Sequence, residues 1–431
     1  METTESYKEI IASLYGLQKY GIKFGLSKTT NLLKAFGNPH KGRRYIHIAG
    51  SNGKGSVGAM LESILVKSGL KVGFYVSPHL VRFTERFRIN GREITPEEAT
   101  ALAREVMEIT GPDEPPTFFE FTTAMALIYF ARQETDIAIM EVGMGGRLDA
   151  TNVILPLVSV ITNISLEHQF FLGRRLRDIA AEKAGIIKKG VDLVTAATQP
   201  PVLEVIKSKC EDRAAPFWRV GKDVRYRTRG SRFNYYGLDH IFRDLELSLK
   251  GTFQYRNAAL ALAAAELLER KGYEIPTRCM EEGLANTHWP GRMYTVSRNP
   301  RVILDGAHNP KATRILAESI RNGFTYDRVL VVLGVMEDKD IKKIIQGIVS
   351  IADYVIFTRA EYYRSAEPEV LLAHGRSLGI TGEVVPALPM AIDKAREMAG
   401  PADLVLVCGS LFIVGEALTY LDPERFIPDG V

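Results

Sequence analysis

A glycine-rich loop with a central lysine is the strongest chemical signal in this chain. The sequence Ala49-Gly50-Ser51-Asn52-Gly53-Lys54-Gly55-Ser56 follows an apolar run that begins at Ile46 and precedes a helical pattern over residues 57–65. In such a loop the backbone N–H groups and the positive end of the following helix bind phosphates. A lysine contacts the outer phosphates, and a hydroxyl binds Mg²⁺. The loop therefore predicts a site for ATP or GTP.

The loop departs from the usual pattern Gly-x-x-x-x-Gly-Lys-Ser/Thr, because Gly55 separates Lys54 from Ser56. The simpler interpretation is a tight turn that closes a strand–helix unit without binding a ligand. A lysine flanked by two glycines, with a serine opening the next helix, favours the nucleotide site instead.

A second glycine-rich segment follows an acidic residue at the end of an apolar run. Glu141 is followed by Gly143, Gly145 and Gly146, and then by Arg-Leu-Asp-Ala-Thr-Asn over residues 147–152. A carboxylate at a strand end is placed to hold Mg²⁺, and the glycines let the backbone approach a ligand. The alternative is a glycine-rich turn with an exposed acid. The polar residues that follow so closely favour a pocket.

For two isolated side chains, a structural role is the simpler interpretation. A lone histidine such as His168 is more often structural than catalytic, and an imidazole is an uncommon ligand for Mg²⁺. Lys183 lies at the end of a helical pattern, where a lysine is usually a solvated charge near the helix C-terminus.

Polar residues also follow a strand in the last third of the chain. Asp305 and His308 come directly after an apolar run over residues 302–304. A strand-end carboxylate is often a nucleotide contact. The alternative is a helix start, because Asn309 and Pro310 suit the N-cap and first helical position. Arg292 lies on the preceding linker and would reach phosphates only when two domains close.

The run Phe118-Phe119-Glu120-Phe121-Thr122-Thr123 opens a helix and is rich in aromatic residues. Aromatic stripes on helices usually belong to the core. One exposed face beside the pocket could instead stack on a flat heterocycle.

The elements that must position these residues alternate between strands and helices. Short apolar runs end at polar or glycine positions, which is typical of a parallel sheet with helices on both faces. Ligands of such sheets gather at the carboxyl ends of the strands. We therefore expect Ser77, Glu141 and His168 to converge near Ser56. The predicted strands of this sheet cover residues 46–49, 73–76, 136–140, 158–162 and 191–195.

The pattern changes in the middle of the chain and then returns. Residues 221–250 suggest a small antiparallel patch, residues 255–271 a helix, and residues 288–292 a break. A second α/β series follows, with predicted strands at 302–304, 329–333, 354–357 and 404–407. The fold class is α/β, and we predict two domains. Residues 1–295 form a nucleotide-binding domain around a mostly parallel sheet, and residues 296–431 form a smaller Rossmann-like domain.

Composition excludes several classes of protein. The chain has 431 residues, 46% hydrophobic and 25% charged, with a formal net charge of +4. No dense basic stripe with interleaved aromatics argues for nucleic acid; Arg225–Arg229 is the nearest, and an exposed strand explains it. Three scattered cysteines give no disulfide framework or zinc site and suit a reducing cytosol. The polar N-terminus and the short apolar runs predict neither a signal peptide nor a membrane span.

The motifs in their order resemble one family. Besides the segments above, the chain carries Ser77-Pro78-His79-Leu80, Glu182-Lys183-Ala184-Gly185-Ile186, Pro290-Gly291-Arg292, Asp338-Lys339-Asp340 and Cys408-Gly409-Ser410-Leu411. The set resembles folylpolyglutamate synthase/dihydrofolate synthase, a family of the Mur ligase superfamily, nearly from end to end. The resemblance implies an ATP-dependent ligase that phosphorylates the carboxylate of dihydropteroate or a folate, after which L-glutamate attacks the acyl phosphate.

The resemblance also implies roles for individual residues. Lys54, His168 and Lys183 would be catalytic, with Lys183 carbamylated to N6-carboxylysine. Two Mg²⁺ ions are expected, on Ser56 and on Ser77, Glu141 and His168. ATP contacts are expected from Asn52, Gly53, Lys54, Gly55, Ser56, Asn257, Arg292, Asp305 and His308. The pterin side is expected at the loop Phe24, Gly25, Leu26, Ser27 and Lys28, at Thr117, Phe118, Phe119 and Glu120, and at Leu148, Asp149 and Ala150.

The chain departs from the family at a few positions. Glu167 stands where many relatives have Asp, and the following loop, residues 170–175, is less acidic than theirs. Two alternatives stay open: a sibling Mur-type ligase acting on another carboxylate, and a P-loop nucleotide-binding protein without ligase activity. We expect a cytoplasmic monomer without nucleic-acid or membrane partners. The sequence does not separate dihydrofolate synthesis from extension of polyglutamate tails.

Overall fold

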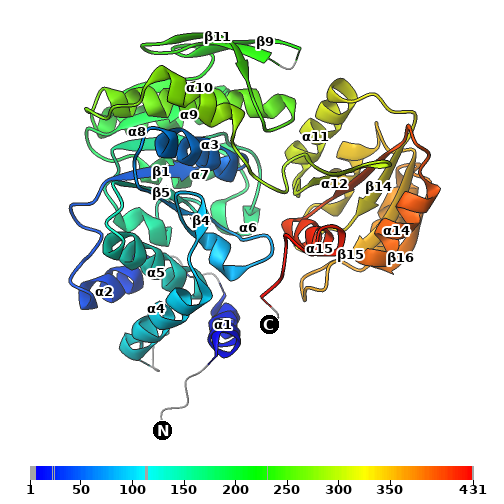
Figure 1. The fold of residues 1–431 in the computed structure, drawn as a ribbon, viewed down its shortest axis with the longest axis horizontal. Coiled ribbons are helices and arrows are strands. Elements are labelled where there is room, and N and C mark those ends of the chain that lie inside the picture. Colours follow the sequence, from blue (N-terminus) through cyan, green and yellow to red (C-terminus); the bar gives the residue numbers. More distant parts are fainter. Residues whose placement is uncertain (1–5, 22, 24, 112–114, 231, 430–431) are drawn as a thin grey trace.

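Two α/β bodies make up the molecule, each around its own sheet (Figure 1). The computed structural model describes residues 6–21, 23, 25–111, 115–230 and 232–429, so Phe24 of the expected pterin-side loop lies outside the described residues. The α/β class predicted from the sequence is confirmed. Across the described ranges, every helix is too short or too polar to cross a lipid bilayer.

The first sheet has eight strands in the order β4-β3-β2-β5-β1-β6-β7-β8. All pairs from β2 to β8 are parallel, whereas β3 and β4 add an antiparallel edge beside β2, so the predicted mostly parallel sheet is confirmed. The strands are β1 (Tyr45–Ala49), β2 (Val72–Tyr75), β3 (Phe87–Ile89), β4 (Arg92–Glu93), β5 (Ile137–Glu141), β6 (Val158–Ile161), β7 (Asp192–Thr195) and β8 (Phe217–Arg219).

Helices cover both faces of this sheet, because alternate residues of a buried strand point to opposite sides. In β1, Ile46 and Ile48 pack in the cluster under α3 and α9, while Tyr45 packs in the cluster under α5. The helices of this body are α1 (Tyr7–Gly16), α2 (Ser27–Ala35), α3 (Lys54–Lys67), α4 (Pro96–Ile109), α5 (Phe118–Arg132), α6 (Gln169–Leu172), α7 (Leu176–Lys183), α8 (Pro200–Asp212), α9 (Thr252–Glu269) and α10 (Thr277–Ala285).

The antiparallel patch predicted for residues 221–250 is a three-stranded sheet that lies over α9 and α10 (Figure 1). Its strands are β9 (Arg225–Arg229), β10 (Arg232–Tyr236) and β11 (Ile241–Glu246). Phe233 and Tyr235 of the middle strand are buried against the first body. The basic segment Arg225–Arg229 is an exposed strand, as predicted.

The second body holds a six-stranded sheet in the order β12-β13-β17-β14-β15-β16, parallel except for the pair β12–β13. Its strands are β12 (Tyr294–Arg298), β13 (Arg301–Asp305), β14 (Val329–Leu333), β15 (Tyr354–Arg359), β16 (Gly382–Ala387) and β17 (Leu404–Cys408). Its helices are α11 (Pro310–Gly323), α12 (Ile341–Ile348), α13 (Pro368–Ser377), α14 (Leu388–Met398) and α15 (Leu411–Leu421). The division expected after residue 295 falls inside β12.

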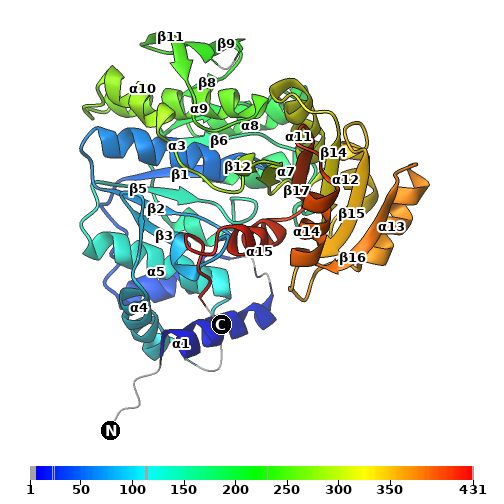
Figure 2. The ribbon, with the colours of Figure 1, turned by 45° about the vertical axis from the view of Figure 1, so that its right-hand side comes forward.

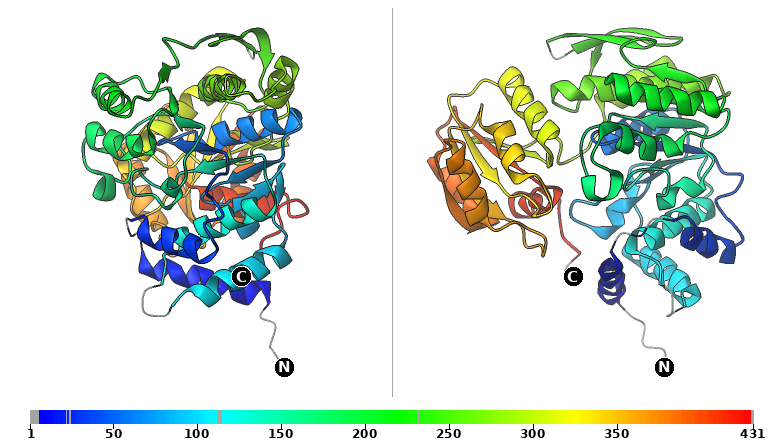
Figure 3. Two further views of the ribbon diagram at one scale, coloured as in Figure 1. Left: turned by 90° about the vertical axis from the view of Figure 1, so that its left-hand side faces the viewer. Right: turned by 180° about the vertical axis from the view of Figure 1, so that it is seen from behind.

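The two bodies touch through a few segments. The backbone of Leu80 lies so close to Gly415 of α15 that a Cβ on this glycine would sit 2.0 Å from the Leu80 carbonyl oxygen. The C-terminal segment returns to the first body and ends beside α1 (Figures 2 and 3). There the Asp429 carboxylate accepts hydrogen bonds from the Tyr7 hydroxyl at 2.9 Å and from the Phe83 N–H at 2.6 Å. The second body is therefore held against the loop that carries Ser77.

Candidate active site

The glycine-rich loop connects β1 to α3 as predicted. Gly50 has φ 146° and would place a Cβ 1.9 Å from Thr162 Oγ1, so a side chain has no room there. Gly53 precedes α3 with φ 90°, a conformation that glycine adopts without strain. The loop thus exposes backbone N–H groups at the start of a helix, which is the geometry that binds phosphates.

Hydrogen bonds fix the loop from the neighbouring strand end. The Asn52 carbonyl accepts from Thr162 Oγ1 at 2.7 Å and from Asn163 Nδ2 at 2.6 Å. The Lys54 ammonium donates to the Gly50 carbonyl at 3.2 Å and lies 3.8 Å from Glu141 Oε1. Lys54 is therefore held back over the loop, beside a carboxylate.

Ser56 lies in the first turn of α3 and is buried. Its Oγ accepts a hydrogen bond from Gln254 Nε2 at 3.3 Å, and Gln254 Oε1 in turn accepts from Asn257 Nδ2 at 2.8 Å. Asn257 also lies against the loop, because a Cβ on Gly53 would come within 2.7 Å of its Oδ1. Helix α9 therefore brings the expected ATP contact Asn257 next to the phosphate loop.

Ser77 and Glu141 face the same cavity from the ends of β2 and β5. Ser77 Oγ and Glu141 Oε2 are buried and have no hydrogen-bond partner among the described residues. Burial raises the pKa of Glu141 to about 7, against the opposing charges of Lys54 and Arg292. Buried oxygens without a donor suit a hard cation, so these residues fit a divalent metal.

His168 adopts a left-handed backbone conformation, with φ 43°, immediately before α6. Burial lowers its pKa to about 4, although the carboxylate of Glu167 acts in the opposite direction. The imidazole is therefore neutral at pH 7 and has a free electron pair on one nitrogen. The described residues contain no cluster of three His, Cys, Asp or Glu side chains with metal-binding geometry, so His168 would need Ser77 and water to complete a site.

Lys183 ends α7 as predicted, but it is not a solvated charge at a helix terminus. The side chain is only 3% exposed, and its Nζ lies 2.8 Å from Glu167 Oε1. Burial acts to raise the pKa of Glu167, but the ammonium groups of Lys183 and Lys54 outweigh it and hold that pKa at about 2. Burial also lowers the pKa of Lys183. The pair is thus an ion pair enclosed beside the phosphate loop.

The second body supplies the other wall of the cavity. The Asp305 carboxylate accepts from the N–H groups of Met293 and Ala307 at 2.9 and 2.8 Å, and burial raises its pKa. His308 Nδ1 donates to the Gly306 carbonyl at 2.8 Å, which leaves Nε2 as an acceptor. Burial lowers the pKa of His308 to about 4.

One hydrogen bond joins the two walls directly. Asn309 Nδ2 donates to Asn52 Oδ1 at 2.8 Å, while Asn309 Oδ1 caps α11 by accepting from the Ala312 N–H at 2.9 Å. The helix-start interpretation of Asn309 and Pro310 is therefore correct, and it holds together with a place at the cavity for Asp305 and His308.

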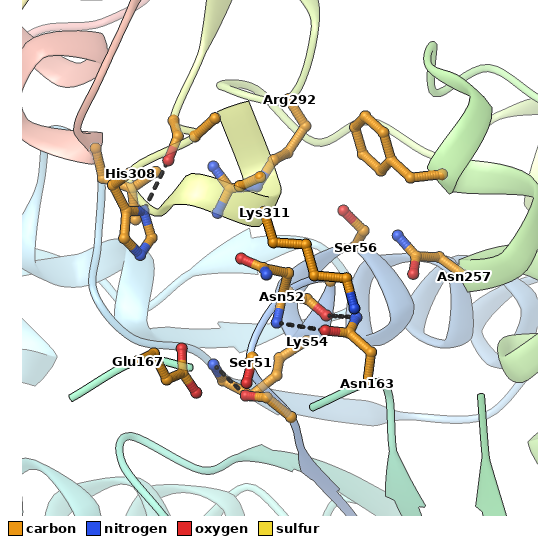
Figure 4. A pocket seen from close by; sticks show the side chains of 18 of the residues that line it. Ser51, Asn52, Lys54, Ser56, Asn163, Glu167, Asn257, Arg292, His308 and Lys311 are labelled. Carbon is orange, nitrogen blue, oxygen red and sulfur yellow. Dashed lines mark hydrogen bonds between the residues drawn. The ribbon is translucent and has the colours of Figure 1, made fainter. Parts of the chain in front are cut away.

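The cavity thus unites all of the expected catalytic, metal and ATP residues (Figure 4). Lys54, Ser56 and Asn257 approach it from the first body, and Arg292 and His308 approach it from the second. The structure also adds residues that sequence reasoning missed. These are Asn163, Phe253, Arg256 and Lys311, whereas Glu167 was named only as a departure from the family. Arg256 and Lys311 lie on helices whose inward faces depend on how the two bodies pack, and no local motif marks them.

The residues expected on the pterin side lie outside this cavity, around the start of α5. Thr117 and Glu120 form a capping box: Glu120 Oε2 accepts from the Thr117 N–H at 2.8 Å, and Thr117 Oγ1 accepts from the Glu120 N–H at 3.2 Å. The polar atoms of these two side chains are therefore hydrogen-bonded within the capping box. The sequence pattern Thr-x-x-Glu is typical of this motif. Phe121 is in the core, whereas Phe118 and Phe119 are half-buried.

The remaining pterin-side residues gather beside these rings. Asp149 is buried, accepts from the Met144 N–H at 2.9 Å and has its pKa raised by burial. Gly25 and Leu148 meet through a backbone hydrogen bond of 3.4 Å. Lys28 Nζ donates to the Pro115 carbonyl at 3.3 Å, next to the start of α5. Leu26, Ser27 and Ala150 lie within the same segments.

A buried cation beside Phe118 was also missed. The Arg86 guanidinium lies 4.9 Å from the centre of the Phe118 ring and donates to His79 Nδ1 at 2.8 Å. Burial lowers the pKa of Arg86 and holds that of His79 well below its usual value. The motif Ser77-Pro78-His79 was recognised, but the partner of its histidine comes from η2 (Phe83–Arg86), and no spacing rule links the two.

Comparison with known proteins identifies the family to which this chain belongs. A model of the Mur ligase middle domain matches residues 48–265, and a model of the Mur ligase glutamate ligase domain matches residues 291–411. The chain is 35% identical to the dihydrofolate synthase/folylpolyglutamate synthase of Bacillus subtilis (strain 168), across 95% of this chain and 98% of that protein. The chain belongs to the dihydrofolate synthase/folylpolyglutamate synthase family.

Solved structures agree with this assignment over the whole ligase. The structure of E. coli FolC in complex with DHPP and ADP has a TM-score of 0.90 at 34% identity and covers 98% of this chain and 100% of that one. A bifunctional folylpolyglutamate synthase/dihydrofolate synthase with Mn, AMPPNP and L-glutamate bound has a TM-score of 0.87 at 30% identity, with coverages of 97% and 100%. This chain is therefore an ATP-dependent ligase that joins L-glutamate to dihydropteroate, to folates or to both.

Proposed function

We propose that the cavity between the two bodies forms an acyl phosphate from ATP and the carboxylate of dihydropteroate or of a folate. One observation carries the proposal: Lys54 lies 3.8 Å from Glu141, whose second oxygen is buried without a partner, and Asp305 and His308 face them across the same cavity. In the first step a carboxylate oxygen bonds to the γ-phosphorus and the bond from that phosphorus to ADP breaks. In the second step the amine of L-glutamate attacks the acyl carbon, loses a proton, and phosphate leaves.

The loop residues Asn52, Gly53, Lys54, Gly55 and Ser56 bind the triphosphate. The N–H groups at the start of α3 face the phosphate oxygens, and the Lys54 ammonium offsets the charge that collects on the transferred group. Its hydrogen bond to the Gly50 carbonyl holds the side chain over the loop before a nucleotide arrives.

Two magnesium sites fit the remaining oxygens. Ser56 would hold one Mg²⁺, and Ser77, Glu141 and neutral His168 would hold the other; bound Mg²⁺ neutralises phosphate charge. The Ser77 and Glu141 oxygens without partners support the second site. The structure of one relative carries Mn together with AMPPNP and L-glutamate, which supports a divalent metal as part of the reaction.

Lys183 is the residue that we expect to become N6-carboxylysine. Carbamylation needs the neutral amine, and burial lowers the pKa of this ammonium, which increases the neutral fraction. The modification would replace a positive charge beside Glu167 by a negative one, so it requires the cations of the loaded site.

The nucleoside end of ATP is expected between the two bodies. Asn257 and Arg292 approach it from α9 and the linker, and Asp305 and His308 from the end of β13. The division into residues 1–295 and 296–431 is part of this proposal, because Arg292 would meet phosphates from the junction. We also expect a monomer; light scattering of the purified enzyme tests it.

The pterin side of the acceptor is expected against Phe118, Phe119 and Asp149. Two half-buried rings and one buried carboxylate offer stacking and hydrogen bonding to a flat, amine-bearing heterocycle. Gly25, Leu26, Ser27 and Lys28 would border it.

Transfer of an oxygen atom from the acceptor carboxylate to the released phosphate tests whether an acyl phosphate forms. The enzyme is given acceptor labelled with ¹⁸O in its carboxylate, together with Mg-ATP and L-glutamate, and the released phosphate is examined by mass spectrometry. The proposal predicts one labelled oxygen in each phosphate released. Phosphate without label would contradict it, because water or glutamate would then be the group that attacks ATP.

A further inference from the structure

A second concave site lies at the junction of the two bodies, next to the nucleotide cavity, with which it shares Arg292. We call it the hinge groove. It is lined by residues 248–250 and 287–289 of the first body and by residues 292–296, 298, 301 and 323–325. It includes open solvent at its mouth and has a volume of about 1560 Å³. Arg292 lies in the walls of both the hinge groove and the nucleotide cavity.

The charge of the hinge groove is of one sign. Its described lining includes Lys250, Arg292, Arg298 and Arg301 but no aspartate or glutamate. Lys250, Arg298 and Arg301 form no ion pair with a carboxylate in the described ranges, in contrast to pairs such as Arg328–Asp403. The charge of Arg292, in the shared wall, acts instead on Glu141 and Asp305 of the nucleotide cavity. Like charges in one depression repel each other, and a bound anion would offset that repulsion.

The cations come from both sides of the junction. Lys250 precedes α9 in the first body, whereas Arg298 ends β12 and Arg301 begins β13 in the second. The Arg301 guanidinium lies 5.4 Å from the centre of the Phe324 ring, a contact that orients it and leaves its N–H edge available. An anion that contacts Lys250 and Arg301 together would bridge the two bodies.

The rim adds a further positive charge and leads to the phosphate loop. The Arg425 guanidinium donates to the Tyr294 hydroxyl at 3.1 Å and to His288 Nε2 at 2.7 Å, so its positive charge lies beside both side chains. Trp289 lies between the hinge groove and the loop, because a Cβ on Gly55 would come within 3.0 Å of its ring. Arg292 and Trp289 thus connect the hinge groove to the residues that bind ATP.

We propose that the hinge groove binds a small multivalent anion, carrying phosphate or carboxylate groups, and that this anion fixes the relative position of the two bodies. The cations of the hinge groove donate charge-assisted hydrogen bonds to it. Because Arg292 lies in both walls, occupancy of the hinge groove changes the affinity for ATP. The proposal concerns a site apart from the substrates of the ligase and does not depend on which acceptor it uses.

Binding of pyrophosphate, measured by isothermal titration calorimetry at low salt without divalent metal, tests the site. The full chain is compared with the double variant Arg298→Gln/Arg301→Gln, with Lys54→Ala, and with Arg225→Gln/Arg227→Gln. The last variant removes the same charge from the exposed strand β9. We expect two sites in the unaltered chain, of which Lys54→Ala weakens one. The hinge variant weakens the other about tenfold or more, and the β9 variant weakens neither.

A parallel titration with citrate separates the two sources of negative charge. Binding of pyrophosphate alone in the hinge groove would assign phosphate groups, binding of citrate alone would assign carboxylates, and binding of both would assign charge in general. The proposal is overturned when neither anion shows binding that the hinge variant weakens, or when the β9 variant weakens it equally. Should the hinge variant not fold, as judged by circular dichroism, exposed Lys250→Gln makes the same test from the first body.

Discussion

The buried pair Lys183–Glu167 leads to the most specific prediction. Substituting Lys183→Met keeps the length of the side chain but removes the ammonium that lies 2.8 Å from Glu167 Oε1. The carboxylate then stays buried without its main partner, since its side chain is only 10% exposed. We expect a large loss of stability, because an uncompensated charge in the interior is costly.

The size of the loss follows from the pKa of Glu167. Lys183, with a smaller effect of Lys54, holds this pKa at about 2 rather than 4.5. One pKa unit corresponds to about 1.4 kcal/mol, so the favourable environment contributes about 3 kcal/mol to the free energy of unfolding at pH 7. Breaking a buried pair typically costs about 3–5 kcal/mol, which agrees. Because the folded-state pKa is lowered, this stability is present above pH 4.5 and is lost as the pH falls toward 2.

Urea unfolding of the purified protein in bicarbonate-free buffer measures the effect. Lys183→Met, Glu167→Gln and the double variant form a thermodynamic cycle, from which we expect a coupling energy of about 3 kcal/mol at pH 7. Lys188→Met is the matched control. This half-buried lysine donates to the Asn152 carbonyl at 2.9 Å and forms no ion pair in the described part of the chain, so its loss should cost about 1 kcal/mol.

Additive effects of the two single substitutions would refute the reasoning. So would a loss in Lys183→Met no larger than that in Lys188→Met. Either result would mean that Lys183 does not stand as an ammonium against Glu167 in the resting enzyme. A difference between the unaltered protein and Lys183→Met that stays constant from pH 7 to pH 3 would also contradict the lowered pKa of Glu167.

Further predictions concern activity. Lys54→Ala should abolish glutamate-dependent phosphate release while the protein stays folded, as judged by circular dichroism; near-normal turnover would remove Lys54 from catalysis. Because burial raises the pKa of Glu141 to about 7, Mg²⁺ should bind the nucleotide-free enzyme more weakly as the pH falls below 7, about tenfold per pH unit, and Glu141→Gln should flatten this dependence in a calorimetric titration. Asn309→Asp keeps the cap of α11 but removes the donor to Asn52, so the KM for ATP should rise about 2- to 12-fold at unchanged stability. An unchanged KM would show that this contact does not hold the closed site.

Much of this architecture can be predicted because local patterns determine it. The turn at Gly53 and the periodicity after it specify the strand, loop and helix around Lys54. Parallel strands share one edge for their carboxyl ends, which explains why Ser77, Glu141 and His168 line one cavity although the chain separates them widely.

Other features could not be predicted from the sequence, because packing between distant segments determines them. The position of Lys183 at a helix end suggested a solvated charge, but burial is set by the neighbouring segment that carries Glu167. Strands β12 and β16 lie at the edges of the second sheet and are only partly buried, so their sequences lack the apolar runs of the central strands. Arg256 and Lys311 reach the cavity only because the two bodies meet there.

Phosphate release by the purified enzyme with Mg-ATP and L-glutamate tests the central claim most directly, with dihydropteroate and tetrahydrofolate compared as acceptors. The account predicts release that requires both an acceptor acid and L-glutamate and that Lys54→Ala abolishes. Release with dihydropteroate alone would mark a dihydrofolate synthase, release with tetrahydrofolate alone a tail-extending synthase, and release with both a bifunctional enzyme. Release that is independent of L-glutamate, or no release with both acceptors, would contradict the account.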